Sequence, residues 1–168
     1  PGGKEVAKMQ LWHKRVADFM ASLKDEKGHI VPVIFRPWHE MSGAWFWWGS
    51  KQCTPEQYKA LFRLTFDAMA QAGLRNLVWS YSPNAQAYDT PEHYFLFYPG
   101  DSYVDVLGVD LYQHNGSAVF IEQCQNEMRI MSEYAKSHNK LYALTEAGYR
   151  NTPDAQWYSS TLVPAIKG

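Results

Sequence analysis

The chain has 168 residues, of which 46% are hydrophobic and 20% are charged, a composition typical of a folded globular protein rather than a disordered one. Its 16 basic and 17 acidic side chains give a formal net charge of -1, and this balance disfavours nucleic acid as a partner. No run of about 20 apolar residues occurs, so the sequence predicts no membrane span. Cys53 and Cys124 lack the C-x-x-C spacing of a zinc site, which leaves one disulfide or two thiols as alternatives.

The first half of the chain alternates between helix and strand signals. Residues 4–23 place apolar side chains at steps of three and four, which predicts a helix. Residues 30–35 are a continuous apolar run, typical of a strand covered on both faces of a parallel sheet. A loop over residues 37–52 holds four of the seven Trp, and one or two of its rings are expected to pack beneath it. Thr54, Pro55 and Gln57 then predict the capped start of a second helix, which ends near Gly73.

The second half continues the same alternation. Residues 77–81, 104–111 and 141–145 are predicted strands, and the apolar spacing over residues 120–135 predicts a helix between the last two. Thr152 and Pro153 open a final short helix that Val163 and Pro164 are expected to end. Strands that alternate with helices predict parallel β-α-β units, and the lack of any repeat or low-complexity linker predicts one domain or part of one.

Polar side chains follow the predicted strands at their carboxyl ends, where the active sites of parallel α/β folds lie. Glu40 follows the first strand and Glu146 follows the fourth, so the two carboxylates are expected to face each other. Two facing carboxylates are the machinery of glycoside hydrolysis, in which one protonates the leaving oxygen and the other attacks the anomeric carbon or activates water. The Trp-rich loop beside Glu40 suits a sugar, because flat rings stack on the C–H faces of pyranoses.

Other catalytic motifs fail on their spacing. His39 and Glu40 begin like the zinc motif H-E-x-x-H, but Gly43 stands where the second His is required. Ser42 lacks the G-x-S-x-G context of a nucleophile elbow, and the dinucleotide and Walker A glycine motifs do not occur. A non-catalytic carbohydrate-binding fragment stays open as an alternative, although it would need neither Glu40 nor Glu146.

Four stretches resemble glycoside hydrolase family 26, chiefly β-mannanases in the clan of retaining (β/α)8-barrel hydrolases: residues 36–49, 79–84, 98–112 and 145–148. The resemblance implies an α/β fold, a partial (β/α)8 TIM barrel with parallel strands four to seven and their helices. A complete barrel takes about 250 residues. The resemblance therefore implies a partial catalytic barrel domain over residues 1–168, truncated at both ends, as an open half-barrel with exposed edges at strands four and seven.

The resemblance also implies residue roles. Glu40 is expected to be the acid/base and Glu146 the nucleophile of a double displacement, with carboxyl groups about 5–5.5 Å apart. The residues expected to bind substrate are Arg36, His39, Trp45, Trp48, Tyr81, Asn84, Asp110 and Tyr112. Arg36 has a second interpretation as a structural ion pair.

The activity that the resemblance implies is endo-acting cleavage of β-1,4-mannosidic bonds in mannan, glucomannan or galactomannan, with no cofactor and no metal ion. Other family 26 specificities, for β-1,3-xylan or mixed-linkage β-glucan, stay open, and so does an inactive fragment. The expected location is extracellular, periplasmic or at the cell surface.

Overall fold

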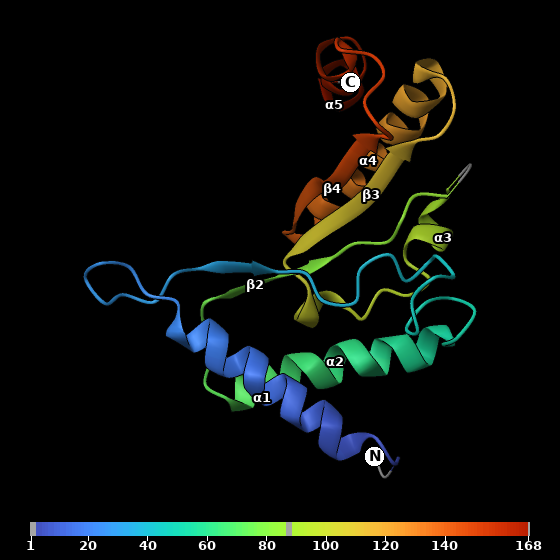
Figure 1. The fold of residues 1–168 in the computed structure, drawn as a ribbon. Coiled ribbons are helices and arrows are strands. Elements are labelled where there is room, and N and C mark those ends of the chain that lie inside the picture. Colours follow the sequence, from blue (N-terminus) through green and yellow to red (C-terminus); the bar gives the residue numbers. More distant parts are fainter. Residues whose placement is uncertain (1–2, 87–88, 168) are drawn as a thin grey trace.

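The protein is described by a computed structural model over residues 3–86 and 89–167. Its sheet has four parallel strands in the order β1-β2-β3-β4 and curls as it goes from one edge to the other (Figure 1). The strands are β1 (Val33–Phe35), β2 (Leu77–Tyr81), β3 (Val106–Gln113) and β4 (Leu141–Tyr149). The helical segments are α1 (Val6–Ser22), α2 (Pro55–Gln71), α3 (Pro91–Tyr94), η1 (Asp101–Tyr103), α4 (Ser117–His138), η2 (Tyr158–Leu162) and α5 (Val163–Lys167).

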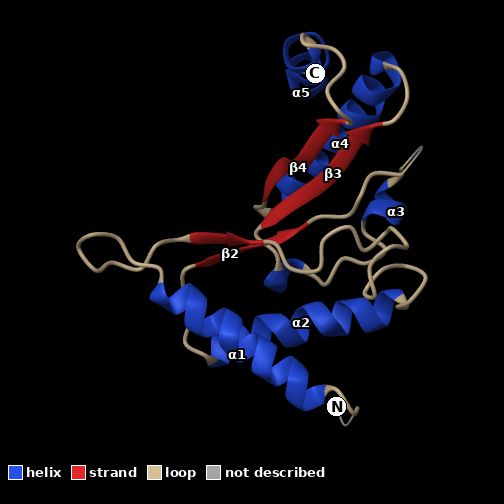
Figure 2. Cartoon of the chain, in the orientation of Figure 1, coloured by secondary structure: helices blue, strands red, loops and turns tan. Residues whose placement is uncertain are grey.

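All strand pairs are parallel, as the alternation of helices and strands predicts. Helices α1 and α2 lie beside the β1–β2 half of the sheet, and α4 lies behind β3 and β4 (Figure 2). The carboxyl ends of the strands therefore meet along one rim, which is where the candidate site lies. Strands β3 and β4 have the longest pairing, and it contains one irregularity between Val109 and Asp110.

Helix α2 begins and ends as its sequence predicts. The Thr54 hydroxyl accepts a hydrogen bond from the Gln57 amide, and the Gln57 side chain accepts one from the Thr54 amide (2.9 Å), which completes the capping box. Gly73 has a φ of +82°, the left-handed conformation that glycine adopts without strain after a helix. The buried side chains of α2, among them Phe62, pack against Trp79 of β2.

Two expectations about individual elements are wrong. Strand β1 is covered on one face only. Its side chains alternate between the two faces of the sheet: Phe35 packs on Trp79, whereas Ile34 points to the opposite face and is 70% exposed. Pro164 does not end the last helical segment. It is the second residue of α5, which continues directly from η2.

Both edge strands of the sheet expose apolar side chains, in agreement with the expected open half-barrel: Ile34 on β1 and Leu141 and Tyr142 on β4. Cys53 and Cys124 are both free thiols, which decides between the two alternatives for the cysteines. Among the described residues, no helix is both long enough and apolar enough to cross a membrane.

Candidate active site

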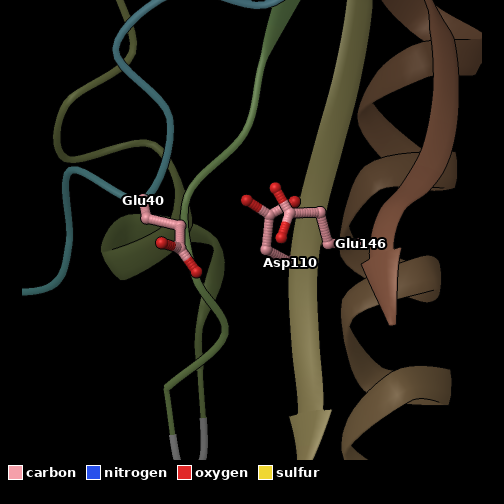
Figure 3. A group of neighbouring side chains, drawn as sticks. All are labelled: Glu40, Asp110 and Glu146. Carbon is pink, nitrogen blue, oxygen red and sulfur yellow. The ribbon is translucent and has the colours of Figure 1, made fainter. Parts of the chain in front are cut away.

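Three carboxylates meet at the rim formed by the strand ends. Glu40 comes from the loop after β1, Asp110 from β3 and Glu146 from β4 (Figure 3). One oxygen atom from each lies within 4.8 Å of the other two. This spacing of the nearest oxygens is compatible with the roughly 5–5.5 Å between the carboxyl groups of retaining glycosidases, in which one carboxylate attacks directly.

The loop that presents Glu40 is held in an unusual backbone conformation. Trp38 and Glu40 have φ angles of 57° and 56°, in the left-handed region that costs a non-glycine residue about 1–3 kcal/mol. Three hydrogen bonds hold it there: Tyr58 Oη donates to the Trp38 carbonyl (3.0 Å), Trp48 Nε1 to the His39 carbonyl (2.9 Å), and the Glu40 amide to the Ser82 carbonyl (2.7 Å). The rest of the fold thereby aims Glu40 across the rim.

Trp45 reaches back over the same loop to Glu40. Its Nε1 donates a hydrogen bond to Glu40 Oε2 (3.0 Å), while the side chain remains 60% exposed. The indole thus orients one carboxylate oxygen and offers an open aromatic surface beside it, as a sugar-stacking ring requires.

Arg36 joins the other two carboxylates. Its Nη1 donates to Asp110 Oδ2 (2.8 Å) and to Ser82 Oγ (3.1 Å), and its Nη2 donates to Glu146 Oε1. The Asp110 side chain is fully buried and receives two further hydrogen bonds at Oδ1, from Ser82 Oγ (2.8 Å) and Thr145 Oγ1 (2.6 Å). Arg36 is therefore an ion-pair partner of Asp110 and Glu146 and orients Glu146, whereas its contact with substrate stays a prediction.

Tyr112 holds the second oxygen of Glu146. Its hydroxyl donates to Glu146 Oε2 (2.7 Å), and the ring lies so close to Gly148 on β4 that a Cβ there would be 2.8 Å from Tyr112 Cε1. Only glycine lets the ring lie flat against β4 at this point. The hydrogen bond to Glu146 raises the pKa of Tyr112 to about 12, so the phenol remains a donor at neutral pH.

The electrostatic balance keeps Glu146 ionised. Partial burial alone would raise the pKa of Glu146, but hydrogen bonds from Tyr112 and Arg36, with the charges of Arg36 and His39, bring that pKa below its usual range. Burial has the opposite net effect on Asp110, whose pKa is raised despite its hydrogen bonds from Thr145 and Ser82 and the charge of Arg36. The two carboxylates that share Arg36 thus have pKa values shifted in opposite directions.

The same three carboxylates are close enough to share a cation, and two of them already share the positive charge of Arg36. The guanidinium of Arg36 bridges Asp110 and Glu146, and both oxygens of Asp110 already accept hydrogen bonds. The arrangement fits acid/base and nucleophilic chemistry, with the arginine supplying the positive charge.

The cleft beside Glu40 has a volume of about 560 Å³. Its lining includes the predicted residues Glu40, Trp45, Asn84, Asp110 and Tyr112, together with His114, Asn115 and Gln123, which the sequence did not single out. Asn84 is placed there by a hydrogen bond from Ser42 Oγ to its Oδ1 (2.6 Å). A larger cavity of about 840 Å³ lies between α1 and α2, away from the strand ends and their carboxylates.

Four of the eight residues predicted to bind substrate do not line this cleft. Arg36 bonds Asp110 and Glu146, and His39 packs against Phe46 with 5.0 Å between ring centroids. Tyr81 is fully buried and donates its hydroxyl proton to the Tyr94 carbonyl (2.7 Å), so its substrate role is wrong: as part of a buried strand end, it belongs to the core. Trp48 stacks on Phe46 with 4.3 Å between ring centroids and bonds the His39 carbonyl, so it packs beneath the loop as a support.

The sequence-based prediction did not include two further residues of this hydrogen-bond network. Ser82 and Thr145 reach Asp110 with their hydroxyl groups. Both stand beside predicted strand ends, which was the available signal. The irregular pairing that brings Thr145 inward has no signature in the sequence.

Comparisons with known proteins agree on one family. Residues 2–148 match the sequence model of Glycosyl hydrolase family 26. A mannan endo-1,4-beta-mannosidase of Bifidobacterium adolescentis is 35% identical over 153 residues, which cover 88% of this chain and 15% of that protein. One of the same name from Bacillus subtilis is 32% identical over 160 residues, covering 91% of this chain and 39% of that protein.

Solved structures give the same answer for the fold. A family 26 β-mannanase from Bacteroides ovatus superimposes with a TM-score of 0.94 and 46% sequence identity, over 99% of this chain and 48% of that one. The expected fold class is therefore confirmed: the curled sheet matches part of the (β/α)8 barrel of that enzyme. The chain spans about half of the structure and less of the two named relatives.

Proposed function

Because the chain belongs to Glycosyl hydrolase family 26, we propose that it carries the catalytic centre of an endo-acting β-1,4-mannanase that retains the anomeric configuration. The observation that carries this proposal is the pairing of Glu40 and Glu146. One oxygen of Glu40 lies within 4.8 Å of one oxygen of Glu146, and Arg36 and Tyr112 keep Glu146 ionised. An ionised carboxylate this close to a second carboxyl group supports a retaining hydrolase, in which the carboxylate attacks the sugar without an intervening water molecule.

The reaction takes two displacements. Glu146 attacks the anomeric carbon while protonated Glu40 gives its proton to the glycosidic oxygen, so that the C–O bond breaks and a glycosyl ester forms on Glu146. Glu40, now ionised, takes a proton from a water molecule. The resulting hydroxide attacks the same carbon, the ester bond breaks, and Glu146 leaves as a carboxylate.

The substrate assignment rests on the relatives and on the cleft. The relatives of Bifidobacterium adolescentis and Bacillus subtilis are both named for mannan. The exposed ring of Trp45 beside Glu40 offers a stacking surface for a pyranose, and Asn84 supplies an amide at the cleft wall. Since such polysaccharides stay outside cells, the proposal includes an extracellular, periplasmic or cell-surface location.

Reducing-end release from linear mannan by the full-length protein tests the proposal, with Glu146→Ala as the inactive control. We expect wild-type release and, by proton NMR, a first product of the same anomeric configuration as the substrate. Loss of the covalent nucleophile should lower the rate on the order of 10⁴-fold or more. Cleavage of β-1,3-xylan or mixed-linkage β-glucan in place of mannan would reassign the substrate. If the protein with an intact active site binds mannan but cleaves none of it, the proposal that it is a hydrolase is contradicted.

A further inference from the structure

The pairing of β3 with β4 has an extra residue at the active site. Val109 pairs with Leu144, but Asp110 pairs with Glu146, so Thr145 has no partner on β3. This is a β-bulge, in which one strand carries two residues opposite one. Because side chains alternate between the two faces of a strand, regular pairing would set Thr145 opposite Asp110 and turn Glu146 to the other face. The bulge is what brings Glu146 onto the face of Asp110.

The side chain of Thr145 is turned into the same network. Its Oγ1 lies 2.6 Å from Asp110 Oδ1, 2.9 Å from Ser82 Oγ and 2.9 Å from the Val109 carbonyl oxygen. A Cβ on Gly108 would lie 2.6 Å from Thr145 Cγ2, so the absence of a side chain at position 108 makes room for the threonine. The threonine hydroxyl is therefore packed against the buried carboxylate that anchors Arg36.

We propose that Thr145 is a positioning residue: as the extra residue of the bulge it turns Glu146 into the cleft, and its hydroxyl, with that of Ser82, holds Asp110 so that Arg36 is aimed at Glu146. The chain of contacts is continuous. Thr145 and Ser82 bond Asp110 Oδ1, Arg36 bonds Asp110 Oδ2, and the other arm of the same guanidinium bonds Glu146. Because a guanidinium is rigid and planar, fixing one arm fixes the direction of the other.

This inference deepens the proposed function and rests on it, since Glu146 must be the nucleophile for its position to affect the rate. Thr145→Val keeps the shape of the side chain and removes the hydroxyl. We expect kcat of the full-length protein to fall about 10-fold with KM within about twofold, because the nucleophile is misdirected while sugar contacts remain. The acidic limb of the kcat/KM profile should move to higher pH, because a weaker hold by Arg36 raises the pKa of Glu146.

Three variants make the test specific. Thr145→Ser restores the hydroxyl and should restore both kcat and the acidic limb. Thr161→Val makes the same change at a threonine that is buried (1% exposed) far along the chain in η2, and should leave both unchanged. In an Arg36→Met background, Thr145→Val should have no further effect, because its action passes through Arg36. Additive losses in that background, or an acidic limb unmoved by Thr145→Val, would overturn the proposal.

A titration of Glu146 by carbon-13 NMR, with wild-type protein and Thr145→Val labelled at the glutamate carboxyl, separates this inference from the mannanase assignment. The inference predicts a higher Glu146 pKa in the variant whether or not mannan is cleaved. An equal Glu146 pKa in both proteins refutes the positioning role of Thr145 even if mannan is hydrolysed. A raised Glu146 pKa in a protein that does not cleave mannan refutes the mannanase assignment and leaves the positioning role standing.

Discussion

The two carboxylates at the centre of the site are held in opposite ways. Glu146 lies within a β-strand and has a donor on each oxygen, Arg36 on one and Tyr112 on the other. Glu40 lies on a loop with a strained backbone, and within the described part of the chain its side chain has one donor, the exposed Trp45. Glu40 is thus held mainly through its backbone, and Glu146 mainly through its side chain.

The difference matches what each carboxylate must do in the proposed reaction. A nucleophile attacks from one direction and must be ionised when substrate arrives, which the positive and hydrogen-bonding partners of Glu146 ensure. An acid/base gives up a proton and takes one back in each cycle, so strong donors on both oxygens would oppose half of its work. The following predictions test that contrast, starting with the most heavily bonded group.

Arg36→Met should have the largest effect, because it leaves Asp110 buried without its ionic partner and removes the donor to Glu146. We expect unfolding free energy to fall by about 3 kcal/mol at pH 7, the lower end of the cost of breaking a buried pair, and mannan cleavage to fall by about 100-fold or more. Urea denaturation and initial rates measure these two quantities.

The pH dependence of that loss has a definite sign. The folded pKa of Glu146 is below its ordinary value of 4.5, so its contribution to stability is present above about pH 4.5 and is lost as the pH falls through the folded pKa. The stability gap between wild type and Arg36→Met should therefore shrink on acidification. A gap that stays constant down to pH 3 would mean that the ion pair does not stabilise the fold.

Gly148→Ala should have an intermediate effect, acting through Tyr112. The new Cβ would lie 2.8 Å from the Tyr112 ring, so the ring must move and its hydrogen bond to Glu146 must lengthen. We expect the acidic limb of the kcat/KM profile to move to higher pH by about 0.7 unit, which is the equivalent of one hydrogen bond of about 1 kcal/mol.

Two further variants calibrate that shift. Tyr112→Phe removes the same hydroxyl directly and should move the limb in the same direction by a similar amount. Gly116→Ala adds a methyl group where no heavy atom lies within 4 Å, and should leave the profile unchanged. If Gly148→Ala lowers stability but leaves the limb in place, Tyr112 does not tune Glu146.

For the two carboxylates, the sequence predicts their positions but not the contacts that hold them. The positions of Glu40 after β1 and of Glu146 toward the carboxyl end of β4, and the capped start of α2, follow from local patterns that the chain carries in a few consecutive residues. The way each carboxylate is held does not, because it depends on contacts between distant segments. Arg36 and Glu146 are 110 residues apart, and Tyr58 supports Trp38 from another element.

Three particular failures share that cause. Tyr81 is buried and Ile34 is exposed because only one face of the sheet is covered by helices, and the sequence of a single strand does not reveal which face that is. The bulge at Thr145 shifts the pairing by one residue, a property of two strands together. Periodicity describes one element at a time, so the residues that support the site from behind stayed hidden, whereas those that follow a strand could be found.

Trp45→Phe probes the loosely held carboxylate, and its effect should depend on the leaving group of the substrate. The substitution keeps an aromatic ring beside the cleft but removes the N–H that orients Glu40 Oε2. We expect kcat/KM on mannan to fall about 10-fold, a fraction of the 10²–10⁴-fold that a general acid provides. On a dinitrophenyl β-mannobioside, whose leaving group departs without protonation, the loss should be within about twofold, because the first displacement then needs no acid.

Trp47→Phe is the matched control, since this ring packs on Trp38 and Trp48 of the same loop and should leave both rates unchanged. Equal losses on the two substrates would show that Trp45 acts on the sugar rather than on Glu40. The acid/base would then have no orienting side chain among the residues that the structure describes.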